Sequence, residues 1–221
     1  MDKRRIKLII FDLDGTLVNA YQAVAQSLNY SLKKFGYSTI DHDTIKKSVG
    51  WGDKDLISRF VSLEDLSRVL SVYRRCHVKS LKGGTKFLPG AKRILMVLKK
   101  KKYQMAIASN RPTRFTQIIL NYLKINPFFA CVLCADKVKN PKPAGDILKG
   151  ILKKLSFKPL EALYVGDMTI DVKAGHKAKV KTIAIVTGSS TRREIVPLRP
   201  YRIIHRIAAV EKIVESINRQ R

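Results

Sequence analysis

The sequence has no long apolar run, few cysteines and few acidic residues. No stretch approaches the roughly 20 consecutive apolar residues that a membrane-spanning helix needs, so we expect no membrane partner. Three cysteines in 221 residues do not make a disulfide framework. Internal repeats and low-complexity segments are also absent from the sequence. With 45% hydrophobic residues, the chain can bury one sizeable core, with or without a small accessory domain.

Two of the cysteines, Cys131 and Cys134, have the C-x-x-C spacing found in many metal sites. A structural zinc ion needs four ligands, and the sequence has no second pair to complete the set. The residues between and just before these cysteines are apolar. We therefore interpret the segment as a buried strand in which the cysteines pack as small apolar side chains.

Acidic residues number 17 against 44 lysines and arginines, which gives a net charge of +27. Such a charge attracts polyanions and speeds the encounter with anionic substrates. The basic residues are scattered from end to end, apart from the run Lys99-Lys100-Lys101-Lys102. No aromatic-basic interleaving or helix-turn-helix pattern stands out. We favour a generally basic surface, and nucleic acid remains an open alternative as a partner.

The first ten residues, MDKRRIKLII, are basic and then apolar, which faintly resembles a signal peptide. Asp12 and Asp14 cut the apolar run short, and no small-residue cleavage site follows. We interpret the segment as a first β-strand and expect the protein to be cytoplasmic.

Five short apolar runs are typical of strands that are buried on both faces of a sheet. They are Lys7–Phe11, Gln104–Ala108, Ala130–Cys134, Ala162–Val165 and Thr182–Val186. From the second run onward, they alternate with segments of helical periodicity. These segments include Ala91–Lys102, Thr113–Leu123 and Asp146–Leu155. The β-α-β-α order predicts an α/β fold with a parallel sheet between layers of helices.

One interval breaks this alternation. Between the first strand and Gly83-Gly84 lie about 65 residues with no convincing strand. The helices expected there are Ala20–Phe35, Thr44–Val49, Lys54–Phe60 and Leu63–Val78. We interpret the interval as an inserted helical unit. It divides the chain into a core of residues 1–16 and 84–221 and an insertion of residues 17–83.

Polar side chains follow the first four expected strands. In chain order they are Asp12 with Asp14, Ser109 with Asn110, Lys142, and Asp167 with Asp171. Ligands of open parallel sheets bind beyond the carboxyl ends of the strands, so we expect these side chains to meet. Taken singly, each is a common turn, cap or surface residue. Their order, each at a strand end, indicates a functional site.

The residue types in this set predict phosphoryl transfer. Several carboxylates at one edge would repel one another, and a divalent cation removes that repulsion. Mg²⁺ prefers carboxylates together with substrate phosphate oxygens. A hydroxyl, an amide and a lysine suit the remaining phosphate oxygens. One carboxylate is then free to act as a nucleophile and another as a general acid and base, through an aspartyl-phosphate.

The same segments resemble the haloacid dehalogenase-like hydrolase superfamily, and within it the phosphoglycolate phosphatase-like group. FDLDGTLV is similar to the first motif of that superfamily, IASN to the second, NPKPAGDIL to the third and YVGDMTIDVKAG to the fourth. The resemblance runs from about Lys7 to Gly188 with the order and spacing of the motifs kept. It implies a Rossmann-like core with an inserted helical cap, in which SVGWGDKDLI is the substrate-side loop.

The resemblance also implies roles for the acidic residues. Asp12 would be the nucleophile, and Asp14 would protonate the leaving oxygen and then activate water. The Mg²⁺ ligands would be Asp12, the main-chain carbonyl of Asp14, and Asp167. Asp171 would orient Lys142 or a metal-bound water.

The remaining roles concern phosphate and the substrate. Ser109, Asn110 and Lys142 would hold phosphate oxygens, while Gly15 and Thr16 would shape the turn after the nucleophile. In the cap, the candidates for the substrate side are Trp51, which could instead pack under its loop, and Lys54, which could instead be a solvated cation. Other cations that could meet a substrate carboxylate are Lys46, Lys47 and Arg59.

Three positions depart from the usual pattern of the group. Asn19 stands where aspartate is usual, and Met168 where a small or polar residue is commoner. The K-P-x-P segment becomes Lys142-Pro143-Ala144-Gly145 and loses a proline. None of these changes removes a catalytic group, so they affect the assignment to a subgroup more than the chemistry.

We therefore expect a Mg²⁺-dependent phosphomonoester phosphatase acting on a small phosphorylated metabolite, with 2-phosphoglycolate as the first guess. A monomer or homodimer is expected. One alternative is a phosphosugar mutase of the same superfamily, which returns the phosphoryl group to a second hydroxyl. Another is a nucleic-acid-associated enzyme acting on polynucleotide phosphate ends. A receiver domain is set aside, because it carries its phosphorylated aspartate after the middle strand and lacks a large helical insertion.

Overall fold

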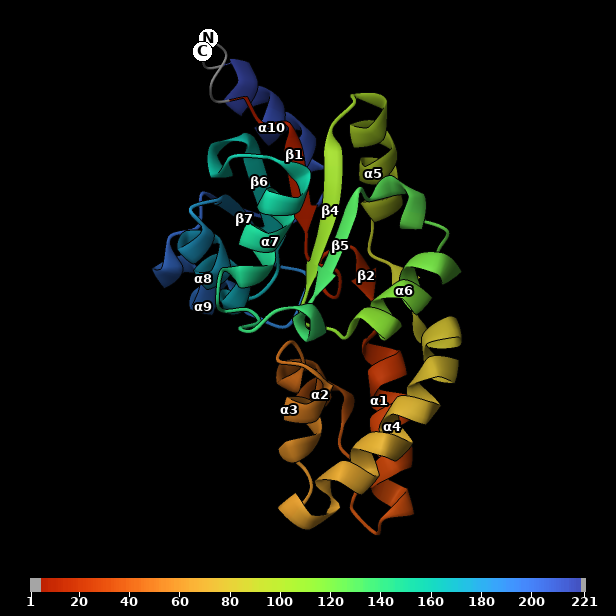
Figure 1. Cartoon of the computed structure of the whole chain (residues 1–221). Helices are drawn as coiled ribbons and strands as arrows, with labels where there is room; N and C mark the ends of the chain where they lie inside the picture. Colours follow the sequence, from red (N-terminus) through yellow and green to blue (C-terminus); the bar gives the residue numbers. More distant parts are fainter. Residues whose placement is uncertain (1–4, 220–221) are drawn as a thin grey trace.

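The computed structural model describes residues 5–219. Residues 1–4 and 220–221, at the two ends of the expected core, lie outside this range. Figure 1 shows a layered part built on a sheet and, below it, a group of helices.

Six parallel strands form the central sheet. In chain order they are β1 (Leu8–Phe11), β4 (Gln104–Ser109), β5 (Cys131–Cys134), β6 (Ala162–Gly166), β7 (Lys181–Ile185) and β8 (Arg202–Ile204). Their order in space is β5-β4-β1-β6-β7-β8, and every neighbouring pair is parallel. The five expected strands and the α/β class are confirmed, and β8 was not expected. The later strands lie on both sides of β1, with β4 and β5 on one side and β6, β7 and β8 on the other. Ligands of open parallel sheets bind at the position where the strand order reverses in this way.

Helices cover both faces of this sheet. One face carries α5 (Ala91–Lys100), α6 (Thr113–Tyr122) and α10 (Ala209–Arg219), and the other carries α7 (Asp146–Leu155) and α8 (Thr169–Ala178). Side chains of β1 alternate between the two cores: Ile9 and Phe11 pack in the first, Leu8 and Ile10 in the second. This double burial explains why the strand is apolar at every position. The short helix α9 (Arg192–Ile195) packs beside α8 through Ile195.

The interval after β1 forms four helices with an apolar core of their own. They are α1 (Tyr21–Lys34), α2 (His42–Ser48), α3 (Asp53–Ser58) and α4 (Leu63–Gly84). Their shared core contains Val24, Leu28, Leu32, Ile45, Leu56, Ile57, Val69 and Tyr73. The chain enters and leaves this unit through β2 (Val18–Asn19) and β3 (Lys86–Phe87), which pair antiparallel. Short 3-10 turns at Asn126–Phe128, Ala135–Lys137, Pro159–Glu161 and Val196–Leu198 complete the described elements.

Helix α4 extends past Val78, the expected end, and includes Gly83 and Gly84. A Cβ at Gly84 would lie 2.8 Å from the backbone nitrogen of Ala23 in α1. The glycine therefore permits a close approach of the two helices, and α4 ends at it.

The cysteines pack as the sequence indicated: Cys131 and Cys134 are buried in β5, and both are free thiols, as is Cys76.

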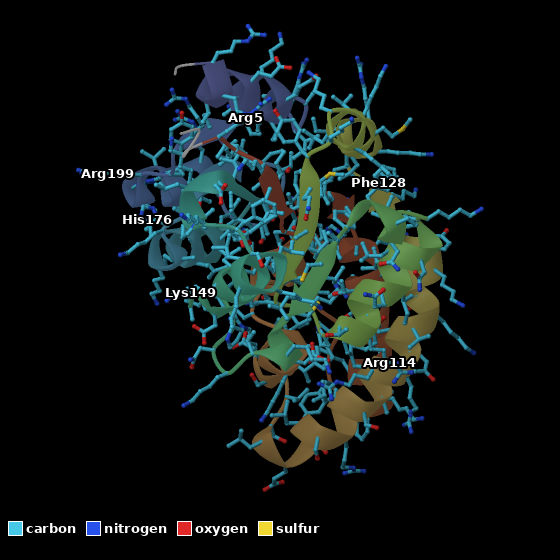
Figure 2. All side chains as sticks on the ribbon, turned by 45° about the horizontal axis from the view of Figure 1, so that its top comes forward. Arg5, Arg114, Phe128, Lys149, His176 and Arg199 are labelled. Atoms are coloured by element: carbon cyan, nitrogen blue, oxygen red, sulfur yellow. The ribbon has the colours of Figure 1, made fainter. Side chains whose placement is uncertain are left out.

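Between residues 5 and 219, no helix combines the length and the apolarity that crossing a membrane would require. Figure 2 shows basic side chains around the whole outline of the molecule, including Arg5, Arg114, Lys149 and Arg199. The positive charge is therefore distributed over the surface.

Candidate active site

The carboxyl ends of three neighbouring strands meet at the centre of the sheet. Phe11, the last residue of β1, pairs with Ile107 in β4 and with Val165 in β6. The next residue, Asp12, continues the register, because its backbone N–H donates to the Val165 carbonyl at 2.8 Å. Since the three strands end at nearly the same level, the polar residues that follow them are brought to one place.

Three carboxylates converge there. One oxygen each from Asp12, Asp167 and Asp171 lies within 4.8 Å of the others, and all three residues are buried. Burial raises the pKa of Asp12 to about 7, against the opposing charge of Lys142. Burial and the charges of Asp12 and Asp171 raise the pKa of Asp167 well above its usual range. The cluster is thus short of positive charge.

Lys142 supplies the cation inside this cluster. Its Nζ lies near four oxygens: Asp12 Oδ1 at 2.7 Å, Asp171 Oδ1 at 2.8 Å, Tyr164 Oη at 3.1 Å and the Ala108 carbonyl at 3.1 Å. Burial alone would lower the pKa of Lys142, but the charges of Asp12 and Asp171 raise it above its ordinary value. The lysine therefore stays charged in a position where it faces the predicted nucleophile.

The Asn110 side chain forms hydrogen bonds with the backbone of Lys142. Its side-chain oxygen accepts from the Lys142 backbone N–H at 2.9 Å, and its amide nitrogen donates to the Lys142 carbonyl at 2.8 Å. The same nitrogen donates to the Gly50 carbonyl of the α2–α3 loop at 3.0 Å. The Asn110 side chain thus positions the lysine and the loop; it also lines the substrate cavity, where its expected contact with phosphate stays a prediction.

The carboxylate set fits Mg²⁺. Asp171 is already engaged, because its Oδ1 accepts from Lys142 and, at 2.6 Å, from Tyr164 Oη. Burial raises the pKa values of Asp12 and Asp167 by disfavouring their charged forms, and a bound cation would stabilise those forms. Hard oxygen ligands in this arrangement are those that Mg²⁺ prefers.

Three residues, Gly15, Thr16 and Gly188, lie against the Asp167 carboxylate. Gly15 has a φ of +79°, and a Cβ there would lie 2.5 Å from Asp167 Oδ2. Next to it, Thr16 Oγ1 donates to Asp167 Oδ1 at 3.0 Å. On the other side, a Cβ at Gly188 would lie 1.6 Å from Asp167 Oδ2. The sequence indicated Gly15 and Thr16 as turn residues, but it did not indicate Gly188.

The substitution Gly188→Ala should therefore displace the Asp167 carboxylate. We expect the affinity for Mg²⁺, measured by titration calorimetry, to fall about 10- to 100-fold, as for residues that support a metal ligand. The control is Gly83→Ala, because no atom lies within 4 Å of a Cβ there. Unchanged Mg²⁺ affinity in Gly188→Ala would show that Asp167 is not a ligand.

Asp14 does not join the carboxylate cluster; it faces Arg111. Arg111 Nε donates to Asp14 Oδ2 at 2.7 Å, and Nη2 donates to Oδ1 at 2.9 Å. The pair is two-pronged, the strongest geometry for a guanidinium and a carboxylate. Both side chains are mostly shielded, with 11% of Arg111 and 22% of Asp14 exposed.

A buried histidine fixes the other side of the guanidinium. Arg111 Nη1 lies 2.7 Å from His77 Nε2, and His77 Nδ1 lies 3.0 Å from Ser27 Oγ. Burial, reinforced by the charge of Arg111, lowers the pKa of His77 to about 2, so the ring is neutral. Nε2 must then accept from Arg111, which leaves Nδ1–H to donate to Ser27. Ser27 Oγ in turn donates to the Ala23 carbonyl at 2.7 Å.

A cavity opens between the sheet edge and the four helices. Its polar lining includes Asp12, Asp14, Ser109, Arg111 and Lys142. Apolar side chains of both parts complete it: Val24, Val49, Leu56, Tyr73, Phe115 and Ile170. The cavity thus joins the predicted catalytic residues to the helical unit.

Of the cap candidates, neither Trp51 nor Lys54 lines this cavity, although Gly50, Gly52 and Asp53 beside them do. Trp51 is 42% exposed. Lys46, Lys47 and Arg59 are also outside the lining. Arg59, the residue that follows α3, pairs instead with Asp55 of that helix at 2.9 Å.

Arg111, His77 and Tyr164 were not expected at the site. Arg111 follows Ser109-Asn110 directly, and a single arginine after a strand usually faces solvent. The available signal for His77 was its place in the apolar stripe of α4, four residues from both Tyr73 and Leu81. For Tyr164 the signal was a hydroxyl in a strand that is otherwise apolar and fully buried.

The family comparison agrees with this geometry. The family model of the haloacid dehalogenase-like hydrolases matches residues 9–185. That range contains the two aspartates after β1 and the site residues from the three other strand ends. The chain belongs to the haloacid dehalogenase-like hydrolase family.

Individual relatives indicate which kind of hydrolase the chain is. The chain is 30% identical over 213 residues to a phosphoglycolate phosphatase of Pseudomonas fluorescens, covering 92% of this chain and 78% of that protein. It is 28% identical over 183 residues to a phosphoglycolate phosphatase of Aquifex aeolicus, covering 83% and 86%. The crystal structure of a predicted phosphoglycolate phosphatase from Haemophilus somnus superposes with a TM-score of 0.88 at 25% identity, covering 94% and 97%. These relatives identify the enzyme as a phosphatase of the family.

Proposed function

We propose that this enzyme is a Mg²⁺-dependent phosphomonoester phosphatase that acts through an aspartyl-phosphate, with 2-phosphoglycolate as its substrate. The observation that carries the proposal is the position of Asp12. It is a buried carboxylate at the cavity wall, paired with Lys142 and close to Asp167. The names of the phosphoglycolate phosphatases that it resembles support the choice of substrate.

Asp12 is the nucleophile in this proposal. Its free oxygen attacks phosphorus, the bond from phosphorus to the ester oxygen breaks, and the phosphoryl group passes to Asp12. Lys142 and Ser109, which line the same cavity, bind phosphate oxygens on which charge is concentrated. Asp12 and Asp167 would hold Mg²⁺ with the main-chain carbonyl of Asp14, and the bound ion would neutralise phosphate charge and orient the phosphoryl group.

Asp14 is the general acid and base in this proposal. It gives a proton to the leaving oxygen in the first step and takes one from water in the second. That water oxygen attacks phosphorus, the bond to Asp12 breaks, and inorganic phosphate leaves. In this structure Arg111 holds the Asp14 carboxylate, so Asp14 must leave that position or share it when the substrate binds.

The four helices α1–α4 serve as the cap, close to the expected range of residues 17–83. Their separate apolar core and the paired strands β2 and β3 at their base support movement of the unit as a body. The cavity lies between the cap and the sheet edge. Closure would exclude bulk water while the aspartyl-phosphate forms.

A panel of phosphorylated metabolites assayed with and without Mg²⁺ tests the proposed function. We expect phosphate release from 2-phosphoglycolate to exceed that from sugar phosphates and from 3′- or 5′-phosphorylated oligonucleotides. Chelation of Mg²⁺ should abolish the release, and readdition should restore it. An isomerised sugar phosphate formed without phosphate release would instead identify a mutase. Preferred turnover of oligonucleotide ends would identify a polynucleotide phosphatase.

A further inference from the structure

Arg111 presents a two-pronged anion-binding edge inside the substrate cavity. The edge consists of Nε and Nη2, and both atoms donate to the Asp14 carboxylate. The third nitrogen, Nη1, donates to neutral His77, so the guanidinium cannot rotate freely. A chain of hydrogen bonds from His77 through Ser27 to the Ala23 carbonyl connects the Arg111 guanidinium to the cap. An arginine held in this way is preorganised for a carboxylate.

The cavity offers few other cations. Among the described residues that line it, the cations are Arg111 and Lys142. Lys142 is occupied by Asp12 and Asp171 and faces the position of phosphate. A second anionic group on a substrate would therefore bind to Arg111, because the cap lysines expected from the sequence lie outside the cavity lining.

We propose that Arg111 selects substrates by their carboxylate, which displaces the Asp14 carboxylate from the Nε–Nη2 edge. The proposal rests on the proposed function and specifies its substrate class: phosphate esters of short hydroxy acids. The exchange keeps the guanidinium paired with a carboxylate, while the displaced Asp14 carboxylate loses its cation and takes up a proton from solvent. It also releases Asp14 beside the ester oxygen that it must protonate. Recognition of the substrate and release of the acid-base residue are then a single event.

A pair of matched substrates tests this inference. 2-Phosphoglycolate carries a carboxylate, and 2-hydroxyethyl phosphate has a neutral hydroxymethyl group in the same place. We expect the wild-type kcat/KM to favour 2-phosphoglycolate, and Arg111→Met to reduce the ratio of the two values about 30-fold, from the loss of a charged hydrogen-bonded pair. Arg111→Lys should restore part of the ratio, because it keeps the charge but not the two-pronged geometry.

The matched control is Arg114→Met. Arg114 is exposed on α6, three residues further along the chain, where Figure 2 labels it. Its substitution should leave the ratio unchanged. If Arg111→Met lowers kcat/KM by the same factor for both substrates, Arg111 only holds Asp14 or phosphate, and the inference is wrong.

Binding of ligands that cannot be hydrolysed tests the role of Arg111 independently of the proposed substrate. Calorimetry should show that 3-phosphonopropionate binds the wild type more tightly than propylphosphonate, and that Arg111→Met removes most of the difference. Failure of the wild type to hydrolyse 2-phosphoglycolate would overturn the proposed substrate. The phosphonate pair would still decide about Arg111, because binding needs no cleavage. Equal binding of the two phosphonates by the wild type would overturn the carboxylate preference.

Discussion

Asp12→Asn is expected to lower the turnover of 2-phosphoglycolate by at least about 10⁴-fold, the scale found when a nucleophile is removed. The fold should persist, because the asparagine oxygen can still accept the hydrogen bond that Lys142 donates to Asp12 Oδ1. The same substitution at Asp43, whose side chain is 86% exposed in α2, is the control and should leave turnover unchanged. Steady-state phosphate release, with circular dichroism of each variant, measures the effect.

Isotope labelling locates the bond that water breaks, and chemical trapping of the intermediate tests the role of Asp12 directly. During multiple turnovers in H₂¹⁸O, water attacks phosphorus and the Asp12 oxygen that bonded to phosphorus returns to the carboxylate. Attack by water on the phosphoryl group should therefore place ¹⁸O in the released phosphate and leave Asp12 unlabelled. Borohydride trapping during turnover should convert the phosphorylated residue 12 to homoserine, which peptide mass spectrometry identifies. Turnover by Asp12→Asn above about 1% of wild type, with no deamidation found by mass spectrometry, would contradict the nucleophile assignment.

The sheet could be predicted because its strands are apolar on both faces. Leu8–Phe11 is completely buried, and its register with β4 and β6 brings three strand ends together. The short strands were missed because period-two patterns need more residues than they contain. β8 has three residues, begins with exposed Arg202 and lies at the edge of the sheet, while β2 and β3 have two each.

The site was predictable where residues follow strands, and less so where partners are distant in the chain. Asp12 and Lys142 were both identified by their position after a strand. Arg111 lies 97 positions from Asp14, and their contact exists only because β1 and β4 are neighbours. His77 reaches the site from the other part of the molecule, so its contact depends on how the helical unit sits on the sheet. Local sequence patterns do not contain that information.

Lys142→Met should be the substitution with the largest effect on stability. The lysine side chain is 2% exposed and pairs with two buried carboxylates, Asp12 and Asp171. Methionine fills a similar volume but leaves those charges without a cation. Breaking a buried ion pair from one side costs about 3–5 kcal/mol in the free energy of unfolding. Turnover should also fall at least about 10²- to 10³-fold, because a donor to the phosphate oxygens is lost. The control is Lys149→Met, an exposed lysine on α7 that Figure 2 labels.

The stability deficit of Lys142→Met should depend on pH. In the wild type, the pKa of Asp12 is already raised to about 7, against 3.8 for an ordinary aspartate. A raised pKa means that the folded state favours the protonated carboxyl, so this group stabilises the fold below about pH 4 and the contribution is lost as the pH rises toward 7. Removing Lys142 takes away the charge that opposes this shift, so the pKa of Asp12 should rise further and the loss should continue above pH 7.

Urea unfolding of the wild type, Lys142→Met and Lys149→Met at pH 5 and pH 8 measures this dependence. We expect the deficit of Lys142→Met to be smaller at pH 5, where Asp12 is protonated, than at pH 8, whereas Lys149→Met should follow the wild type at both. A deficit of equal size at the two pH values would mean that the charge of Asp12 does not contribute to the loss of stability. The lysine would then fill space at the site without being needed to offset the charge of Asp12, and its proposed role toward phosphate would have to stand on the kinetic effect alone.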